Sequence, residues 1–171
     1  WANSGLVVEI HPEDVLSTPT NDPLALMNWI ERLEGESWTQ ARCSLRAPAQ
    51  RMTDFLSGRS SVDLPKSSYN MGLTPSRLDE WLPSFITKRI QKAFQLFDRQ
   101  TKGFLTAEAQ LIALESRTSS PVRILRESTS CEHPLLRGFF PCGEGAGYAG
   151  GIVSAAMDGE RCAEGVASYL G

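Results

Sequence analysis

The sequence is poor in the residues that usually build metal centres and disulfide frameworks. It has two histidines, His11 and His133, and four cysteines among 171 residues, with no C-x-x-C spacing. The cysteines therefore predict reduced thiols, as expected for a cytoplasmic protein, rather than a disulfide scaffold. Neither histidine belongs to a recognisable triad or zinc-ligand pattern. We therefore assign no catalytic residue and predict no metal site.

Long apolar runs and a strong net charge are also missing. No stretch approaches the roughly 20 apolar residues of a membrane span, and the formal net charge is −3 at pH 7. A charge this close to zero gives no electrostatic basis for binding nucleic acid or an anionic membrane. We therefore expect neither as a partner.

Glycine is concentrated in one segment, GFFPCGEGAGYAGGIVSAAMDG at residues 138–159. The apolar pair Phe139-Phe140 predicts the end of a strand, and a helix of small residues is predicted to begin at Ile152. Five glycines between them predict a tight turn, and these are Gly143, Gly145, Gly147, Gly150 and Gly151. Glycines let a backbone approach a ligand closely, and the N–H groups at a helix start favour anionic or electron-rich atoms. The segment therefore predicts contact with a dinucleotide or a flavin.

The run PCGEGAGYAGGIVSAAMDG, together with RTSSPVRI at 117–124, resembles the C-terminal end of a bacterial family of FAD-dependent dehydrogenases. That family is distantly similar to flavoproteins of the glutathione-reductase type. Looser similarity extends to residues 3–10, 47–59 and 73–86. The family's N-terminal fingerprint for the adenosine pyrophosphate is absent, since no G-x-G-x-x-G follows a strand near the start. We therefore interpret the chain as a fragment of a larger FAD-dependent oxidoreductase, inactive alone and unable to retain FAD.

The resemblance implies a set of cofactor contacts in the glycine-rich segment. Glu144 would bond the ribityl or phosphate region of FAD, and most of the other contacts would come from backbone N–H groups. The cofactor-binding residues would be Gly143, Glu144, Gly147, Gly150, Gly151 and Ile152. The alternative is a tight turn without a ligand, in which the acid is stabilised by the nearby helix dipole.

A second cluster is predicted at a turn in the preceding segment, and its members are Arg117, Ser119, Ser120 and Arg123. Arginine binds carboxylate or phosphate groups with two parallel hydrogen bonds, so the cluster could hold an anionic group. The resemblance implies that it faces the flavin and a cavity for a small-molecule substrate. The alternative is a solvated hairpin with ordinary turn residues.

The pattern of apolar residues predicts an α+β chain in two parts. Residues 1–126 would be a mostly helical insertion with a small β-sheet, which the resemblance makes a cap or substrate domain over the flavin. Residues 134–171 would supply the last strand and helix of the flavin-binding domain, with the rest of the parent flavoprotein as partner. Helices are expected from Pro23 to near Gly35, over 47–58, from Thr74 and from about Ser84 to Phe97. Strands are expected at Gly5–Ile10, Leu111–Glu115 and Val122–Leu125.

Two other functions fit the same residues. The chain could be a protein-interaction module, with an exposed aromatic patch built from Trp29, Trp38, Trp81 and Phe97. It could also be a nucleotide-binding domain without redox chemistry that uses the turn at 143–151.

Two further patterns in the sequence are interpreted as structural rather than functional. Cys142 is expected to be a small buried residue at a strand end, because a redox pair needs a second cysteine close by.

Residues 93–109 imitate an EF-hand loop that starts at Asp98. Three ligand positions of that loop hold Gln100, Lys102 and Ala109. Calcium requires oxygen ligands and a bidentate acid there, so we expect no calcium site.

Overall fold

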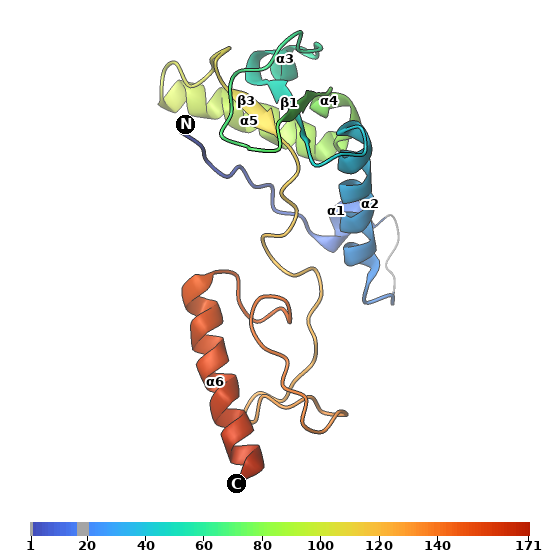
Figure 1. Cartoon of the computed structure of the whole chain (residues 1–171), viewed down its shortest axis with the longest axis vertical. Coiled ribbons are helices and arrows are strands. Elements are labelled where there is room, and N and C mark those ends of the chain that lie inside the picture. The colour runs from blue at the N-terminus through green and yellow to red at the C-terminus, as the bar shows by residue number, and fades with distance from the viewer. Residues whose placement is uncertain (1, 17–20) are drawn as a thin grey trace. The chain divides into compact units, whose positions relative to one another are not determined.

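The computed structural model describes residues 2–16 and 21–171, and within them it contains six helices and three strands. The helices are α1 (Pro12–Val15), α2 (Ala25–Gln40), α3 (Met52–Ser57), α4 (Leu78–Trp81), α5 (Ser84–Gln100) and α6 (Ile152–Leu170) (Figure 1). The strands are β1 (Ala47–Arg51), β2 (Leu73–Pro75) and β3 (Gln110–Ile112). The expected α+β class is confirmed. No helix in the described ranges is both long and apolar enough to cross a lipid bilayer.

The chain divides into two compact units. One contains the described residues up to Asp14 and Ile30–Leu114, and the other contains the described part of Val15–Trp29 together with Glu115–Gly171. The small sheet belongs to the first unit. Both segments that the sequence marks as candidate sites belong to the second.

Strand β1 is the centre of the sheet, whose strand order is β2-β1-β3. It pairs in parallel with β2, with Ala47 opposite Leu73, and antiparallel with β3, with Gln50 opposite Leu111. The helix expected over 47–58 is therefore correct only for its second half, since α3 begins at Met52. Pairing on both sides with strands that are distant in sequence outweighs the local helix pattern.

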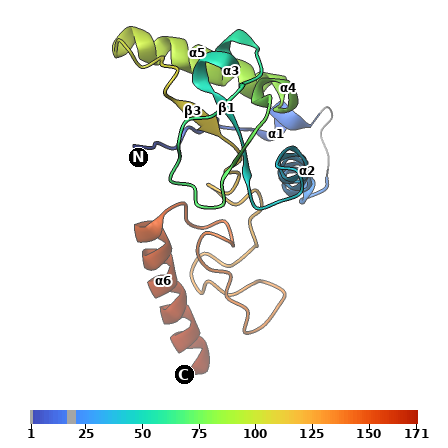
Figure 2. The same ribbon diagram turned by 45° about the horizontal axis from the view of Figure 1, so that its top comes forward.

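Helix α5 forms the apolar centre of this unit with α3 and the loop after α5. Its buried residues include Ile86, Ile90 and Phe94, which lie on the predicted stripe. Phe94 meets the ring of Phe55 edge-on, with 6.3 Å between centroids, and the ring of Phe104 at 5.9 Å. Helices α3 and α4 both lie against β1 (Figure 2). The predicted helix from Ser84 is confirmed and extends slightly further than expected.

Three further expectations for this unit are corrected. Residues 5–10 form no strand, because no described strand pairs with them, and the Glu9 carbonyl accepts a hydrogen bond from Arg89 at 2.9 Å instead. The helix expected from Thr74 begins only at Leu78, since Leu73–Pro75 pairs with β1. Helix α2 continues past Gly35 to Gln40, because one glycine costs a helix only about 1 kcal/mol.

The loop that imitates an EF-hand has a structural role in this unit. The Asp98 Oδ1 atom accepts hydrogen bonds from the backbone N–H groups of Gly103 and Leu105, at 3.2 and 3.1 Å. One carboxylate oxygen thus closes the turn after α5. Leu111–Glu115 is partly confirmed as a strand, through β3.

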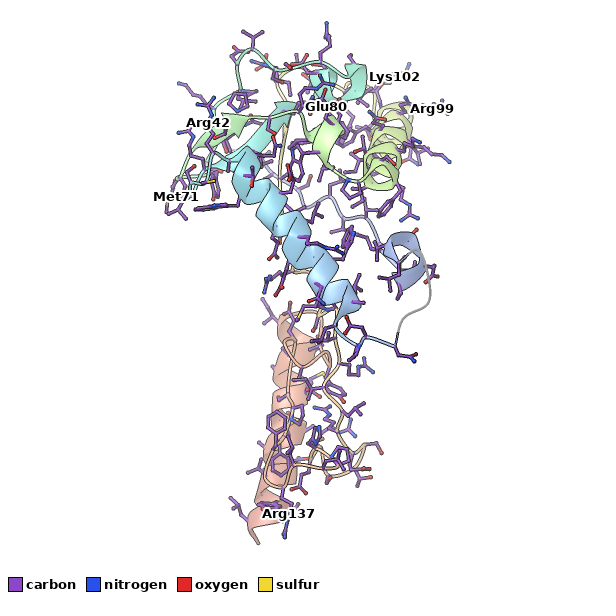
Figure 3. All side chains as sticks on the ribbon, turned by 90° about the vertical axis from the view of Figure 1, so that its right-hand side faces the viewer. Arg42, Met71, Glu80, Arg99, Lys102 and Arg137 are labelled. Atoms are coloured by element: carbon purple, nitrogen blue, oxygen red, sulfur yellow. The ribbon has the colours of Figure 1, made fainter. Side chains whose placement is uncertain are left out.

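The second unit is built from the first residues of α2, from loops and from α6, which begins at Ile152 as predicted. The strands expected at Val122–Leu125 and Phe139-Phe140 are absent, because the described residues offer them no neighbouring strand to pair with. The loop instead lies along α6, where the ring of Phe140 meets that of Tyr169 with 5.7 Å between centroids. Figure 3 shows the neighbouring Arg137 beside the C-terminal end of α6.

Candidate functional site

The two segments singled out in the sequence lie against each other in the unit that contains α6. The Ile124 N–H donates to the Ala146 carbonyl at 3.1 Å, and Arg123 Nε donates to the Gly147 carbonyl at 3.0 Å. The Ser120 hydroxyl donates to the Val122 carbonyl at 2.7 Å. Residues 120–124 therefore lie against the glycine-rich turn, and this contact brings part of the second predicted cluster to the first.

A buried ion pair anchors this turn to α6. Arg126 Nη2 lies 2.5 Å from Asp158 Oδ1, and Nη1 lies 3.0 Å from Oδ2, with side chains only 4% and 9% exposed. Asp158 Oδ2 also accepts the Gly143 N–H at 2.8 Å, and Arg126 Nη1 donates to the Pro141 carbonyl at 2.8 Å. The pair thus fixes the first residues of the turn against the helix.

The same contacts set the charge state of the anchor. The hydrogen bonds from Arg126 lower the pKa of Asp158 from 3.8 to about 2, although burial opposes this shift. The hydrogen bonds to Asp158 in turn raise the pKa of Arg126. The guanidinium also lies over the ring of Tyr148, 3.6 Å from its centroid. Arg126 and Asp158 therefore both stay charged at neutral pH, and the Tyr148 ring packs on the guanidinium.

Sequence reasoning missed this ion pair. Arg126 lies in a polar connector where a charged residue is unremarkable, and its partner is 32 residues further along the chain. The one available signal was Asp158 itself, an acid within the small-residue run that forms the first turns of α6.

The glycines of the turn differ in what surrounds them. A Cβ placed on Gly147 would lie 2.6 Å from the Val122 carbonyl oxygen, and the backbone φ there is +84°. Gly147 is therefore required by the fold whether or not a ligand binds. A Cβ on Gly150 or Gly151 would meet only a serine hydroxyl, at 4.0 and 3.9 Å respectively. The space beside these two glycines is open.

The first turn of α6 presents backbone donors beside that space. The N–H groups of Gly151, Ile152 and Val153 find no acceptor in the part of the chain that the structure describes. The first N–H groups of any helix lack partners within the helix, and the helix dipole gives that end a partial positive charge. Ile152 is 91% exposed. This end of α6 can therefore donate hydrogen bonds to an electron-rich group.

Glu144 lies on the exposed side of the same turn. A Cβ on either of its neighbours, Gly143 or Gly145, would meet no atom within 4 Å. Its carboxylate makes no hydrogen bond or ion pair with any described residue. The carboxylate is thus able to accept hydrogen bonds from a ligand.

The predicted substrate-binding residues differ in their exposure and in the contacts described for them. Arg123 donates a hydrogen bond to the Gly147 carbonyl, and its guanidinium lies 5.0 Å from the centroid of the Tyr148 ring. The Ser120 hydroxyl donates a hydrogen bond to the Val122 carbonyl. Arg117 and Ser119 are exposed, and the Ser119 hydroxyl is the oxygen nearest to the open side of Gly150. A role in substrate binding stays a prediction for all four.

The expectation for Cys142 is wrong. Its side chain is exposed, and the structure supplies the second cysteine that the sequence spacing did not reveal, because Cys162 of α6 lies beside it. The Sγ atoms of both cysteines and one Asp158 carboxylate oxygen lie within 4.8 Å of one another. Arg126 bonds both oxygens of Asp158 and lies 3.0 Å from Cys162 Sγ. A metal ion would share this space with a fixed positive charge, so the arrangement disfavours one.

Comparisons with known proteins agree with the resemblance seen in the sequence. A family profile described as "FAD-dependent protein, C-terminal domain-like" matches residues 1–118. A protein of Clostridium beijerinckii, described as an uncharacterized protein, is 38% identical over 165 residues. That alignment covers 95% of this chain, and so reaches both units, but only 30% of the relative's own length. The chain belongs to the family of FAD-dependent protein C-terminal domains.

Proposed function

We propose that this chain is the cap and the C-terminal flavin-contacting part of an FAD-dependent oxidoreductase. Residues 1–126 supply the cap with its substrate-facing surface, and residues 134–171 supply the turn and helix that contact FAD. Membership of the family supports FAD as the cofactor of the longer protein. The observation that carries the contact is the open backbone at Gly150 and Gly151, where α6 begins.

The residues of this turn fit a flavin on physical grounds. Unpaired N–H groups at the start of α6 suit electron-rich ring or phosphate oxygens. The Glu144 carboxylate suits a ribityl hydroxyl, which is a hydrogen-bond donor. The absence of side chains on the two glycines leaves room for a ligand against the backbone.

The protein residues then have distinct tasks. FAD, when bound, supplies the hydride chemistry, while the protein supplies position and polarity. Arg126 and Asp158 hold the turn on α6, so the donors keep a fixed direction. Arg117 and Ser119 bind an anionic group of the substrate, because both residues are exposed and the Ser119 hydroxyl lies beside the open side of Gly150.

The flavin content of full-length variants tests this proposal. Gly150→Val and Gly151→Val place a branched side chain in the open space, and neither backbone has a positive φ that would strain valine. We expect each variant to lose bound FAD while the melting temperature of the apo protein stays unchanged. Gly159→Val is the matched control, because a Cβ there meets no atom within 4 Å and lies further along α6, away from the turn. Flavin occupancy equal to wild type in both turn variants would refute the contact.

A further inference from the structure

Cys142 and Cys162 form a thiol pair that the proposed flavin contact does not use. Their sulfur atoms lie within 4.8 Å of each other, although the residues are 20 positions apart in sequence. Cys142 is exposed in the loop before the glycine-rich turn, whereas Cys162 is only 4% exposed on α6. One thiol is therefore open to reagents in solvent, and the other is sheltered beside it.

Hydrogen bonds hold the backbone on both sides of Cys142 close to α6. The Pro141 carbonyl accepts from Arg126 at 2.8 Å and from the Cys162 thiol at 3.8 Å. The Gly143 N–H donates to Asp158 at 2.8 Å. The exposed Cys142 side chain is thus tethered next to Cys162, which raises the effective concentration of one thiol at the other.

We propose that Cys142 and Cys162 form a reversible disulfide by exchange with a small-molecule disulfide such as oxidised glutathione. The Cys142 thiolate attacks one sulfur of oxidised glutathione, and one glutathione thiolate leaves. Cys162 then loses its proton to solvent and attacks the Cys142 sulfur, which releases the second glutathione. The two protein thiols lose two electrons and two protons in total, and one glutathione disulfide becomes two thiols.

The environment of Cys162 sets the order of these steps. Burial, together with the neighbouring Cys142 thiol, raises the pKa of Cys162 to about 12, although Arg126 opposes the shift. A thiol with so high a pKa is almost fully protonated at neutral pH, and exchange requires the thiolate. The exposed Cys142 is therefore the thiol that attacks glutathione first, and Cys162 resolves the mixed disulfide.

Peptide mapping of the full-length protein tests the pairing directly. Cleavage after Arg126, Arg137 and Arg161 places Cys131, Cys142 and Cys162 in three separate tryptic peptides. The protein is incubated with oxidised glutathione, its remaining thiols are alkylated, and the digest is analysed by mass spectrometry. We expect peptide 138–161 to be joined to the peptide that begins at Cys162, and dithiothreitol to separate them.

Variants identify the attacking and resolving thiols. Cys162→Ser should leave Cys142 carrying glutathione, and Cys142→Ser should leave Cys162 unmodified at the same exposure. Cys43→Ser is the control, because that exposed cysteine belongs to the other unit and its loss should not alter the joined peptide. Two alkylated, unlinked cysteines in the wild type would overturn the proposal. Cys131 joined to Cys162 would overturn it too, and so would bound zinc that protects both thiols from alkylation.

Discussion

Replacing Asp158 with asparagine removes the charge that anchors the glycine-rich turn to α6. The shape of the side chain is nearly kept, so the change isolates the electrostatic contribution of the ion pair. Arg126 would remain buried, with its guanidinium facing a neutral amide. We expect the segment that contains the turn to open more readily as a result.

The shifted pKa of Asp158 gives the size of this effect. A change from 3.8 to about 2 corresponds to about 2.5 kcal/mol, because one pKa unit equals about 1.4 kcal/mol. Leaving a buried charge without its partner costs about 3–5 kcal/mol in other proteins. Asp158→Asn should therefore lower the opening free energy of the turn by about 2–4 kcal/mol. Glu80→Gln, whose side chain is 64% exposed beside Arg77, should change stability by less than about 1 kcal/mol.

The sign of the pH dependence follows from the direction of the shift. The folded pKa of Asp158 is lower than its unfolded value, so the carboxylate stabilises the fold fully above about pH 4. That stabilisation declines as the pH falls towards 2. The difference between wild type and Asp158→Asn should therefore shrink over this interval.

Native-state hydrogen exchange provides the assay, because it reports local opening without requiring the whole chain to unfold. The informative amides are those of Gly147 and Tyr148, which donate to the carbonyls of Glu144 and Gly143 at 2.9 and 3.0 Å. Equal exchange of these amides in wild type and Asp158→Asn at pH 7 would refute the anchoring role.

Three further outcomes follow from the site. Gly147→Ala should destabilise the turn by about 1–3 kcal/mol in the same exchange assay, because its φ is +84° and the new methyl group meets the Val122 carbonyl. Gly145→Ala places its methyl group in open space and should not destabilise the turn. Equal effects of the two substitutions would contradict this reasoning. Glu144→Gln should weaken FAD binding by about 1–3 kcal/mol in a flavin titration of the full-length protein, with the exposed Glu160→Gln unchanged. The 171-residue chain alone should show no flavin absorbance after purification, and a stoichiometric flavin spectrum would count against its interpretation as a fragment.

The helices that the sequence predicted well are those with a local signal. Helix α5 has a continuous apolar stripe from Ile86 to Phe94, and α6 begins where glycine gives way to Ile152. Both patterns are complete within one stretch of sequence, so no distant contact is needed to recognise them. The family resemblance was equally local, since it rested on short runs of residues.

The features that sequence reasoning missed depend on distant partners. Strand β1 contains Pro48, and its sequence together with the residues after it has a helix-like pattern. Only the pairing with β2 and β3 makes β1 extended. Cys142 lacks a nearby cysteine in sequence, yet the loop returns to α6 and brings Cys162 beside it. The strand expected at Phe139-Phe140 failed for the opposite reason, since the described residues provide no strand for it to pair with.

The most direct test of the central claim is an experimental structure of the full-length protein with FAD bound. The account predicts that the backbone nitrogens of Gly151 and Ile152 lie within hydrogen-bond distance, about 2.7–3.2 Å, of a flavin or phosphate oxygen. It also predicts that the Arg126–Asp158 pair remains closed beneath the turn. A structure in which FAD binds elsewhere, with the start of α6 facing solvent or only protein, would contradict it.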